Sequence, residues 1–154
     1  MEKKYLKDCK YADHIRIGVG LILYYCDKIL LEKRVDCNNW GLTGGRVEVG
    51  ETIEDAATRE CFEETSIELK KEKLKLLGIY SDVNQFRIIN YPDSCFHAID
   101  IIFYYEIDQE VNIKKSEESF DVRFFKINFL PSNIVPPAKK PIVDFIKLGL
   151  MCDN

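Results

Sequence analysis

The alternation of apolar and polar positions divides the chain into several strands and two helices. Residues 16–34 are rich in β-branched and aromatic side chains on either side of Asp27 and Lys28, which predicts two strands joined by a tight turn. The same composition predicts further strands at residues 74–80, 98–107 and 122–127. Residues 98–107 are apolar almost throughout, so we expect them to form a central strand of the sheet.

Two other segments have the pattern of helices. Residues 53–65 contain neither glycine nor proline, and Thr52 can cap their start, with Asp55 in the place of the usual glutamate of a capping box. Residues 138–151 carry apolar side chains at helical spacing after two prolines, which predicts a closing amphipathic helix. Between them, four glycines at residues 41–50 indicate backbone bends or a close approach to a ligand. This order of elements predicts one α/β domain with helices packed on a mixed sheet.

Composition and charge narrow the functional classes. A chain of 154 residues suits one domain, and its net charge of -4 argues against a general binder of nucleic acids or anionic membranes. The six cysteines are widely spaced without a CxxC pair, which indicates free thiols in a reducing compartment. The apolar run at residues 17–25 is too short to span a membrane and lacks a signal-peptide cleavage site. We therefore expect a cytoplasmic protein with neither nucleic acid nor membrane as its partner.

The helix predicted at residues 53–65 has acidic side chains where an ordinary helix has apolar ones. On a helical wheel Glu60 and Glu64 fall within the apolar stripe, and Glu63 lies at its edge. Burying an unpaired carboxylate is costly, and three of them at positions i, i+3 and i+4 repel one another unless a positive charge lies between them. Oxygen ligands suit Mg²⁺ or Mn²⁺ rather than zinc. The pattern indicates metal-assisted hydrolysis of a phosphoryl or diphosphate group, and a solvated acidic face with this spacing by chance is the alternative.

Residues 45–67, GRVEVGETIEDAATRECFEETSI, resemble the Nudix box of the MutT-like hydrolases, G-x5-E-x7-R-E-U-x-E-E-x-G-U with U a bulky apolar residue. Three positions in or beside the box depart from the family: Thr43 replaces a usual proline, Cys61 a larger aliphatic residue and Ser66 a glycine. The resemblance extends over roughly residues 15–131 and implies a Nudix-type α/β/α sandwich with a mixed β-sheet. The whole chain, residues 1–154, is then a single Nudix hydrolase domain with a short N-terminal extension at residues 1–14. The matching positions are Gly45, Glu51, Arg59, Glu60, Glu63, Glu64 and Ile67.

The resemblance also implies roles for individual residues. Glu60, Glu63 and Glu64 would bind Mg²⁺ or Mn²⁺, with the carbonyl oxygen of Gly44 as a further ligand. Arg59 resembles the arginine that orients these carboxylates, and Glu51 resembles its ion-pair partner; a plain surface arginine is the alternative for Arg59. Arg34, at the end of a predicted strand, resembles a phosphate-contacting arginine, although a solvent-exposed strand end would look the same in the sequence.

Residues outside the box should supply the general base and the specificity. Glu118 is the favoured base, with Glu117 and Asp121 beside it, and the alternative is a solvated charged loop. The irregular segments at residues 82–94 and 108–119 should flank the box helix and line a cleft, unless they only connect strands and the partner subunit of a homodimer sets the selectivity. Aromatic side chains that could stack on a base or sugar, or else pack in the core, are Tyr80, Phe86, Tyr91 and Phe96.

The function expected from this resemblance is hydrolysis of a diphosphate bond in a nucleoside diphosphate linked to another group, with water substituting at phosphorus. A Nudix-like module that senses a nucleotide without hydrolysing it is the main alternative, but such a module would be expected to lose box acids that this chain retains. An isomerase of prenyl diphosphates would need a catalytic cysteine and several histidines, whereas Cys61 lies inside the box and the chain has only 2 His. The box binds what all such substrates share, so it does not choose among them.

Overall fold

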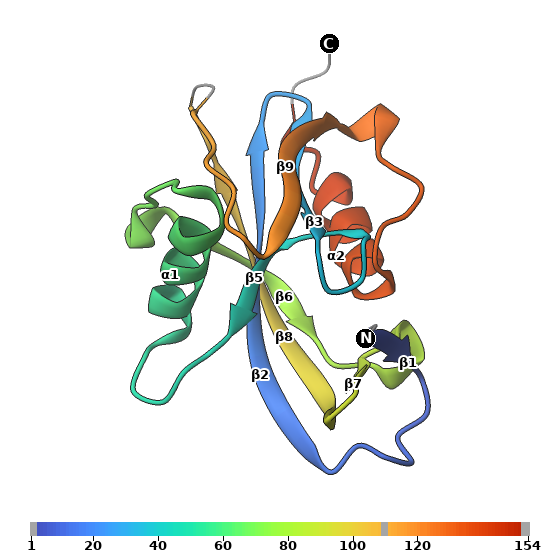
Figure 1. Ribbon diagram of the computed structural model, residues 1–154. Helices are drawn as coiled ribbons and strands as arrows, with labels where there is room; N and C mark the ends of the chain where they lie inside the picture. Colours follow the sequence, from blue (N-terminus) through green and yellow to red (C-terminus); the bar gives the residue numbers. More distant parts are fainter. Residues whose placement is uncertain (1–2, 109–110, 152–154) are drawn as a thin grey trace.

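The computed structural model describes residues 3–108 and 111–151, and it has a mixed β-sheet between two helices (Figure 1). Helix α1 (Ile53–Thr65) lies on one side of the sheet and helix α2 (Pro136–Lys147) lies on the other. This arrangement confirms the predicted α/β/α sandwich. The predicted extension begins with residues 1 and 2, and the predicted loop at residues 108–119 includes 109 and 110; these four positions and 152–154 lie outside the described residues.

In the described part of the chain the sheet has nine strands in the order β1-β7-β8-β2-β3-β4, with β5 beside β2, β6 beside β8 and β9 beside β3. Strands β2 and β8 run parallel, and the other pairings between these strands are antiparallel. Because β8 pairs with β2, β6 and β7, it is central, as predicted. The strands are β1 (Lys4–Leu6), β2 (His14–Tyr25), β3 (Lys28–Arg34), β4 (Trp40–Gly41), β5 (Thr43–Arg46), β6 (Lys75–Tyr80), β7 (Ile88–Tyr91), β8 (Ser94–Glu106) and β9 (Ser119–Lys126).

Helix α1 has the predicted bounds and the predicted cap. The Thr52 hydroxyl accepts a hydrogen bond from the Asp55 amide at 3.1 Å. The helix buries Ala56, Ala57 and Cys61 against the sheet and ends at Ser66, whose amide donates to the carbonyl of Phe62. Ser66 adopts the left-handed conformation with φ of 63°, where glycine would be unstrained.

Replacing Ser66 with glycine should therefore stabilise the fold. The left-handed conformation costs an L-residue about 1–2 kcal/mol, and the extra freedom of glycine in the unfolded chain offsets part of that relief. We expect the free energy of unfolding to rise by about 0.5–1 kcal/mol, measured by urea denaturation. An unchanged or lower midpoint for Ser66→Gly would show that the strain is relieved some other way.

Helix α2 starts and ends earlier than the predicted residues 138–151. It begins with Pro136 and Pro137, whose missing amide protons are not needed in the first turn, and it ends at Lys147. Leu150, counted as part of its apolar face, lies beyond the helix and is exposed. A third proline, Pro141, cannot donate to the carbonyl of Pro137 four residues earlier, so that carbonyl is left free for another donor. No helix in the described ranges is both long and apolar enough to cross a membrane.

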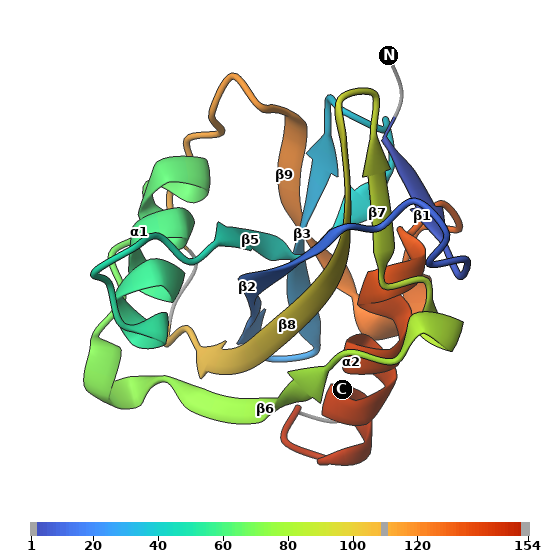
Figure 2. The ribbon, with the colours of Figure 1, turned by 90° about the horizontal axis from the view of Figure 1, so that it is seen from below.

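The segment predicted as an irregular loop at residues 82–94 contains strand β7, which pairs with both β8 and β1. Tyr91 pairs with Ser94, so Pro92 and Asp93 form a two-residue hairpin turn. The strand has only four residues, too short to show a clear alternation, and this explains why the pattern missed it. The predicted N-terminal extension likewise contributes β1 to the edge of the sheet, and Figure 2 shows β1 beside β7.

Candidate active site

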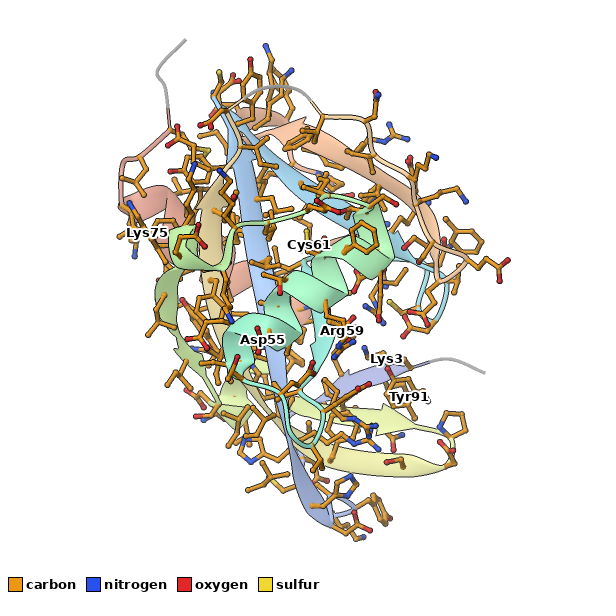
Figure 3. All side chains as sticks on the ribbon, turned by 90° about the vertical axis from the view of Figure 1, so that its left-hand side faces the viewer. Lys3, Asp55, Arg59, Cys61, Lys75 and Tyr91 are labelled. Atoms are coloured by element: carbon orange, nitrogen blue, oxygen red, sulfur yellow. The ribbon has the colours of Figure 1, made fainter. Side chains whose placement is uncertain are left out.

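Arg59 connects three of the box carboxylates on the outer side of α1. Its Nε and Nη2 donate to Glu51 at 3.0 and 2.7 Å. Its Nη1 donates to Glu60 at 2.9 Å and to Glu63 at 3.3 Å. Nη2 also donates to the carbonyl of Arg46, which holds the helix against strand β5. These bonds from Arg59 hold the pKa of Glu51 below its usual value. Figure 3 shows Arg59 projecting from α1 toward β5. Three of the four glycines that predicted bends lie in strands, Gly41 in β4 and Gly44 and Gly45 in β5.

Glu64 lies on the opposite, buried side of α1. The residue is 4% exposed, and its Oε1 accepts a hydrogen bond from the Gly44 amide at 3.2 Å. Oε2 has no hydrogen-bond partner among the described residues. A buried carboxylate oxygen without a partner is costly, so this atom is suited to a cation or to a water bound to one.

Glu60 lies between Arg59 and Glu64 in the sequence, and its carboxylate is packed against Gly45 of strand β5. A Cβ atom at position 45 would stand 2.5 Å from Cδ of Glu60 and 2.7 Å from Oε2, so Gly45 is needed for the carboxylate to occupy its place. Burial raises the pKa of Glu60; Arg59 opposes that change, while Glu63 and Glu118 add to it. Glu118 is therefore close enough to Glu60 for their charges to interact.

The carboxylates are not gathered as a metal cage in this structure. Across residues 3–108 and 111–151, no three acidic, histidine or cysteine side chains lie close enough together to hold an ion. Arg59 bridges Glu60 and Glu63, and Glu64 Oε1 is taken by the Gly44 amide. The all-oxygen donor set and the unpartnered Oε2 nevertheless fit a hard divalent cation.

The remaining predicted acids lie where β9 begins. The carbonyl of Glu118 accepts a hydrogen bond from the Val35 amide, which ties this segment to the end of β3. Asp121 forms an ion pair with Arg123. The amide of Lys114 donates to the carbonyl of Thr65, so part of the predicted loop at residues 108–119 lies against the end of α1. None of the described residues of this segment lines the cavity described next.

A cavity of about 240 Å³ begins at strand β5 and extends along the sheet toward β1 and β7. Three of the residues predicted to contact a substrate, Arg34, Tyr91 and Phe96, line it. Arg34 is not a solvated strand end, because it donates two hydrogen bonds of 3.0 Å to Asp36. Phe86 does not line this cavity and is covered by the ammonium of Lys7, 4.7 Å from its ring centre.

The inner end of the cavity has a buried ion pair that the sequence reasoning missed. Arg87 is 1% exposed; it donates to Asp100 at 2.6 Å and to the carbonyl of Pro137 at 2.8 Å. That carbonyl is the one that Pro141 leaves free. Burial raises the pKa of Asp100, although Arg87 and Lys3 oppose the change. Asp100, the one charged residue within the apolar stretch 98–105 of β8, was the available signal for this pair.

Known proteins have similar sequences and similar folds. The NUDIX domain family model matches residues 14–145. An ADP-ribose pyrophosphatase of Methanocaldococcus jannaschii is 34% identical over 152 residues, covering 96% of this chain and 82% of that protein. A MutT NUDIX hydrolase from Burkholderia pseudomallei superposes with a TM-score of 0.71 at 22% identity, over 86% of this chain and 98% of its own. The NUDIX domain of Shewanella oneidensis NrtR, crystallised with ADP-ribose, has a TM-score of 0.69 at 17% identity over 92% of each chain.

Proposed function

Because this chain belongs to the Nudix hydrolase family, we propose that it uses Mg²⁺ or Mn²⁺ to cleave the diphosphate bond of a nucleoside diphosphate derivative, with ADP-ribose as the first substrate to test. The observation that carries the proposal is the joint position of the box acids and the cavity. The acids on α1 and the cavity meet at residues 44–46 of strand β5. A diphosphate across these residues would have its bridging bond beside the acids.

Each box residue has a distinct part in this proposal. Glu60, Glu63 and Glu64, with the Gly44 carbonyl, would hold the cation, which when bound polarises phosphate oxygens and lowers the pKa of a bound water. Arg59 keeps Glu60 and Glu63 in place, and Glu51 keeps Arg59 in place. Glu118, near Glu60, is the proposed acceptor of the proton released by the attacking water. The water oxygen joins one phosphorus while the bridging P–O bond breaks, so ADP-ribose would yield AMP and ribose 5-phosphate.

The cavity bounds how much of the substrate is enclosed. Small-molecule sites are commonly about 300–1,000 Å³, so about 240 Å³ has room for one part of the substrate, a base, a sugar or a phosphate. The rest would lie along the open side of the box. Selection among nucleoside diphosphate derivatives therefore depends on the residues of the cavity.

The test is a panel of substrates incubated with purified protein and Mg²⁺ or Mn²⁺. ADP-ribose, nucleotide sugars, dinucleotides, CDP-alcohols and oxidised nucleoside triphosphates are compared, with products identified by chromatography. We expect metal-dependent cleavage at the diphosphate, which chelation by EDTA stops. Tight binding of one compound without turnover under any metal condition would instead support a sensor module.

Aromatic substitutions should separate the cavity from its surroundings. Phe96 and Tyr91 line the cavity, with ring centres 6.2 Å apart, whereas Phe86 is outside it. We expect Phe96→Ala and Tyr91→Ala each to raise KM for the best panel substrate by roughly tenfold, from the loss of about 1.5 kcal/mol of ring contacts. Phe86→Ala is the matched control and should leave KM unchanged. Equal KM values for all three variants and the wild type would exclude a role for these rings in binding.

A further inference from the structure

The first residues of the described chain form part of the cavity wall, although they precede the region that matches the family model, residues 14–145. Strand β1 pairs with β7, and the Lys3 amide donates to the carbonyl of Asp36 at 3.3 Å. Lys3 and Tyr5 line the cavity, while Lys4 between them is exposed. This alternation turns every second side chain of the segment toward the proposed substrate.

The ammonium of Lys3 is held inside the wall rather than in open solvent. Its side chain is 12% exposed, and Nζ lies 5.1 Å from the ring centre of Tyr5 and 5.2 Å from that of Tyr91. Figure 3 shows Lys3 and Tyr91 next to each other at this end of the molecule. Burial, together with the charge of Arg34, lowers the pKa of Lys3 to about 8. The structure therefore keeps a cation where its charge is unfavourable unless a further anion arrives.

The carboxylate closest to Lys3 is already shared. Asp36 is 3.8 Å from Nζ of Lys3, but it accepts both hydrogen bonds of Arg34 and a third, of 3.3 Å, from the Tyr91 hydroxyl. These bonds overcome the effect of burial and hold the pKa of Asp36 low. Asp36 thus faces two cations, Lys3 and Arg34, and a second carboxylate, Glu32, lies 4.0 Å from Nη1 of Arg34.

The whole cavity has the same imbalance, in a protein whose net charge is -4. Asp100 is the acid among its lining residues, and Arg87 is already paired with it. The proposed substrates bring a negative charge on each phosphate, which matches a positive wall. The cationic lining residues are Lys3, Arg16, Arg34, Arg46 and Arg87.

From this geometry we propose that Lys3 is a substrate-binding residue whose ammonium contacts a phosphate oxygen of the substrate, so that the N-terminal strand completes the substrate site. The inference rests on the proposed function, because it takes a phosphate ester as the ligand. A neutral hydroxyl or base carbonyl would leave the excess positive charge of the cavity lining uncompensated, which is why a phosphate oxygen is the partner assigned.

The proposal has a consequence for the pH dependence of binding. Lys3 is charged below about pH 8 in the free protein, and a bound phosphate would raise its pKa, so affinity should fall as pH rises through 8. Burial raises the pKa values of Tyr5, Tyr91 and Cys37, and the hydrogen bonds from Arg34 lower that of Asp36. These neighbours therefore keep their charge state at pH 8. The charged or titratable groups that face Lys3 from its own and adjoining elements are Tyr5, Arg34, Asp36, Cys37, Tyr91 and Asp100.

The test measures binding of ADP-ribose and of inorganic diphosphate by calorimetry in EDTA, from pH 7 to 9.5, on the full chain. Binding of either ligand requires no turnover, so the measurement separates binding from catalysis. At pH 7 we expect Lys3→Met to weaken binding of ADP-ribose about tenfold or more, as for loss of a hydrogen bond to a charged group. Lys3→Arg should retain the affinity and keep it constant to pH 9.5. Lys4→Met, on the exposed face of β1, is the matched control and should bind as the wild type does.

Several results would overturn the proposal. Equal affinity of Lys3→Met and the wild type for ADP-ribose is one such result. A second is weaker binding by Lys3→Met together with wild-type binding that does not depend on pH, because this combination indicates a structural role for Lys3. A wild-type protein that binds neither probe would overturn it too. If binding depends on Lys3 but no metal gives turnover, the proposed hydrolase activity fails and the binding role of Lys3 stands.

Discussion

Glu64→Gln should lower turnover by on the order of a thousandfold while leaving the fold intact, because it removes the most buried of the proposed metal ligands. The amide keeps the shape of the side chain, and its oxygen can still accept the hydrogen bond from Gly44. What is lost is the charge on the oxygen that has no partner in the described residues. Steady-state assays with the best panel substrate and Mg²⁺ measure the effect.

Stability measurements on the same variant test the reason for the loss. Without metal, a neutral amide is less costly to bury than an ionised carboxylate, so Glu64→Gln should be at least as stable as the wild type. Mg²⁺ should raise the unfolding temperature of the wild type through binding to the native state, and this increase should shrink in the variant. Glu68→Gln, at an exposed position just beyond the box, is the control and should resemble the wild type. A Glu64→Gln enzyme with near-normal turnover would remove Glu64 from the proposed metal site.

The predictable part of this site is the part that lies on one helix. Glu63 and Glu64 follow Glu60 by three and four residues, so helical periodicity alone places them near Glu60 and puts Glu64 on the buried side. The same spacing does not say which acid Arg59 contacts. Its guanidinium reaches Glu51, eight residues earlier, because the loop before α1 folds back beside the helix. The resemblance to the Nudix box suggested that pair, and the periodicity did not.

The cavity could not be predicted in the same way, because its residues come from distant parts of the chain. Asp100 and Arg87 meet only through the pairing of β7 with β8 and the packing of α2 on the sheet. Lys3 reaches the cavity only because β1 joins the edge of β7. Strands as short as β1 and β7 have little periodicity of their own, so their partners in the sheet determine them. Sequence patterns therefore grouped the box acids, and of the cavity residues they suggested Arg34, Tyr91 and Phe96 but neither Lys3 nor the pair of Arg87 and Asp100.

Gly45→Ala should reduce turnover by on the order of a hundredfold although it adds only one methyl group. That methyl would stand 2.5 Å from Cδ of Glu60, a distance that real Cβ atoms essentially never show, so the carboxylate must move. Glu60 also accepts a hydrogen bond from Arg59, so its displacement disturbs the arginine that holds Glu63. We expect weaker Mg²⁺ binding together with the loss of turnover, measured by titrating the metal in the activity assay.

The control for this change is Gly78→Ala on β6, where the added methyl would meet the Tyr80 ring at 3.4 Å, an ordinary contact distance. It should keep both turnover and metal affinity, because β6 contributes none of the box acids and no residue of the cavity. The two variants add the same group to a strand of the same sheet, so their difference isolates the space that Glu60 needs. If Gly45→Ala loses no more activity than Gly78→Ala, then the position of Glu60 is not critical, and the role proposed for it in binding the cation must pass to Glu63 and Glu64.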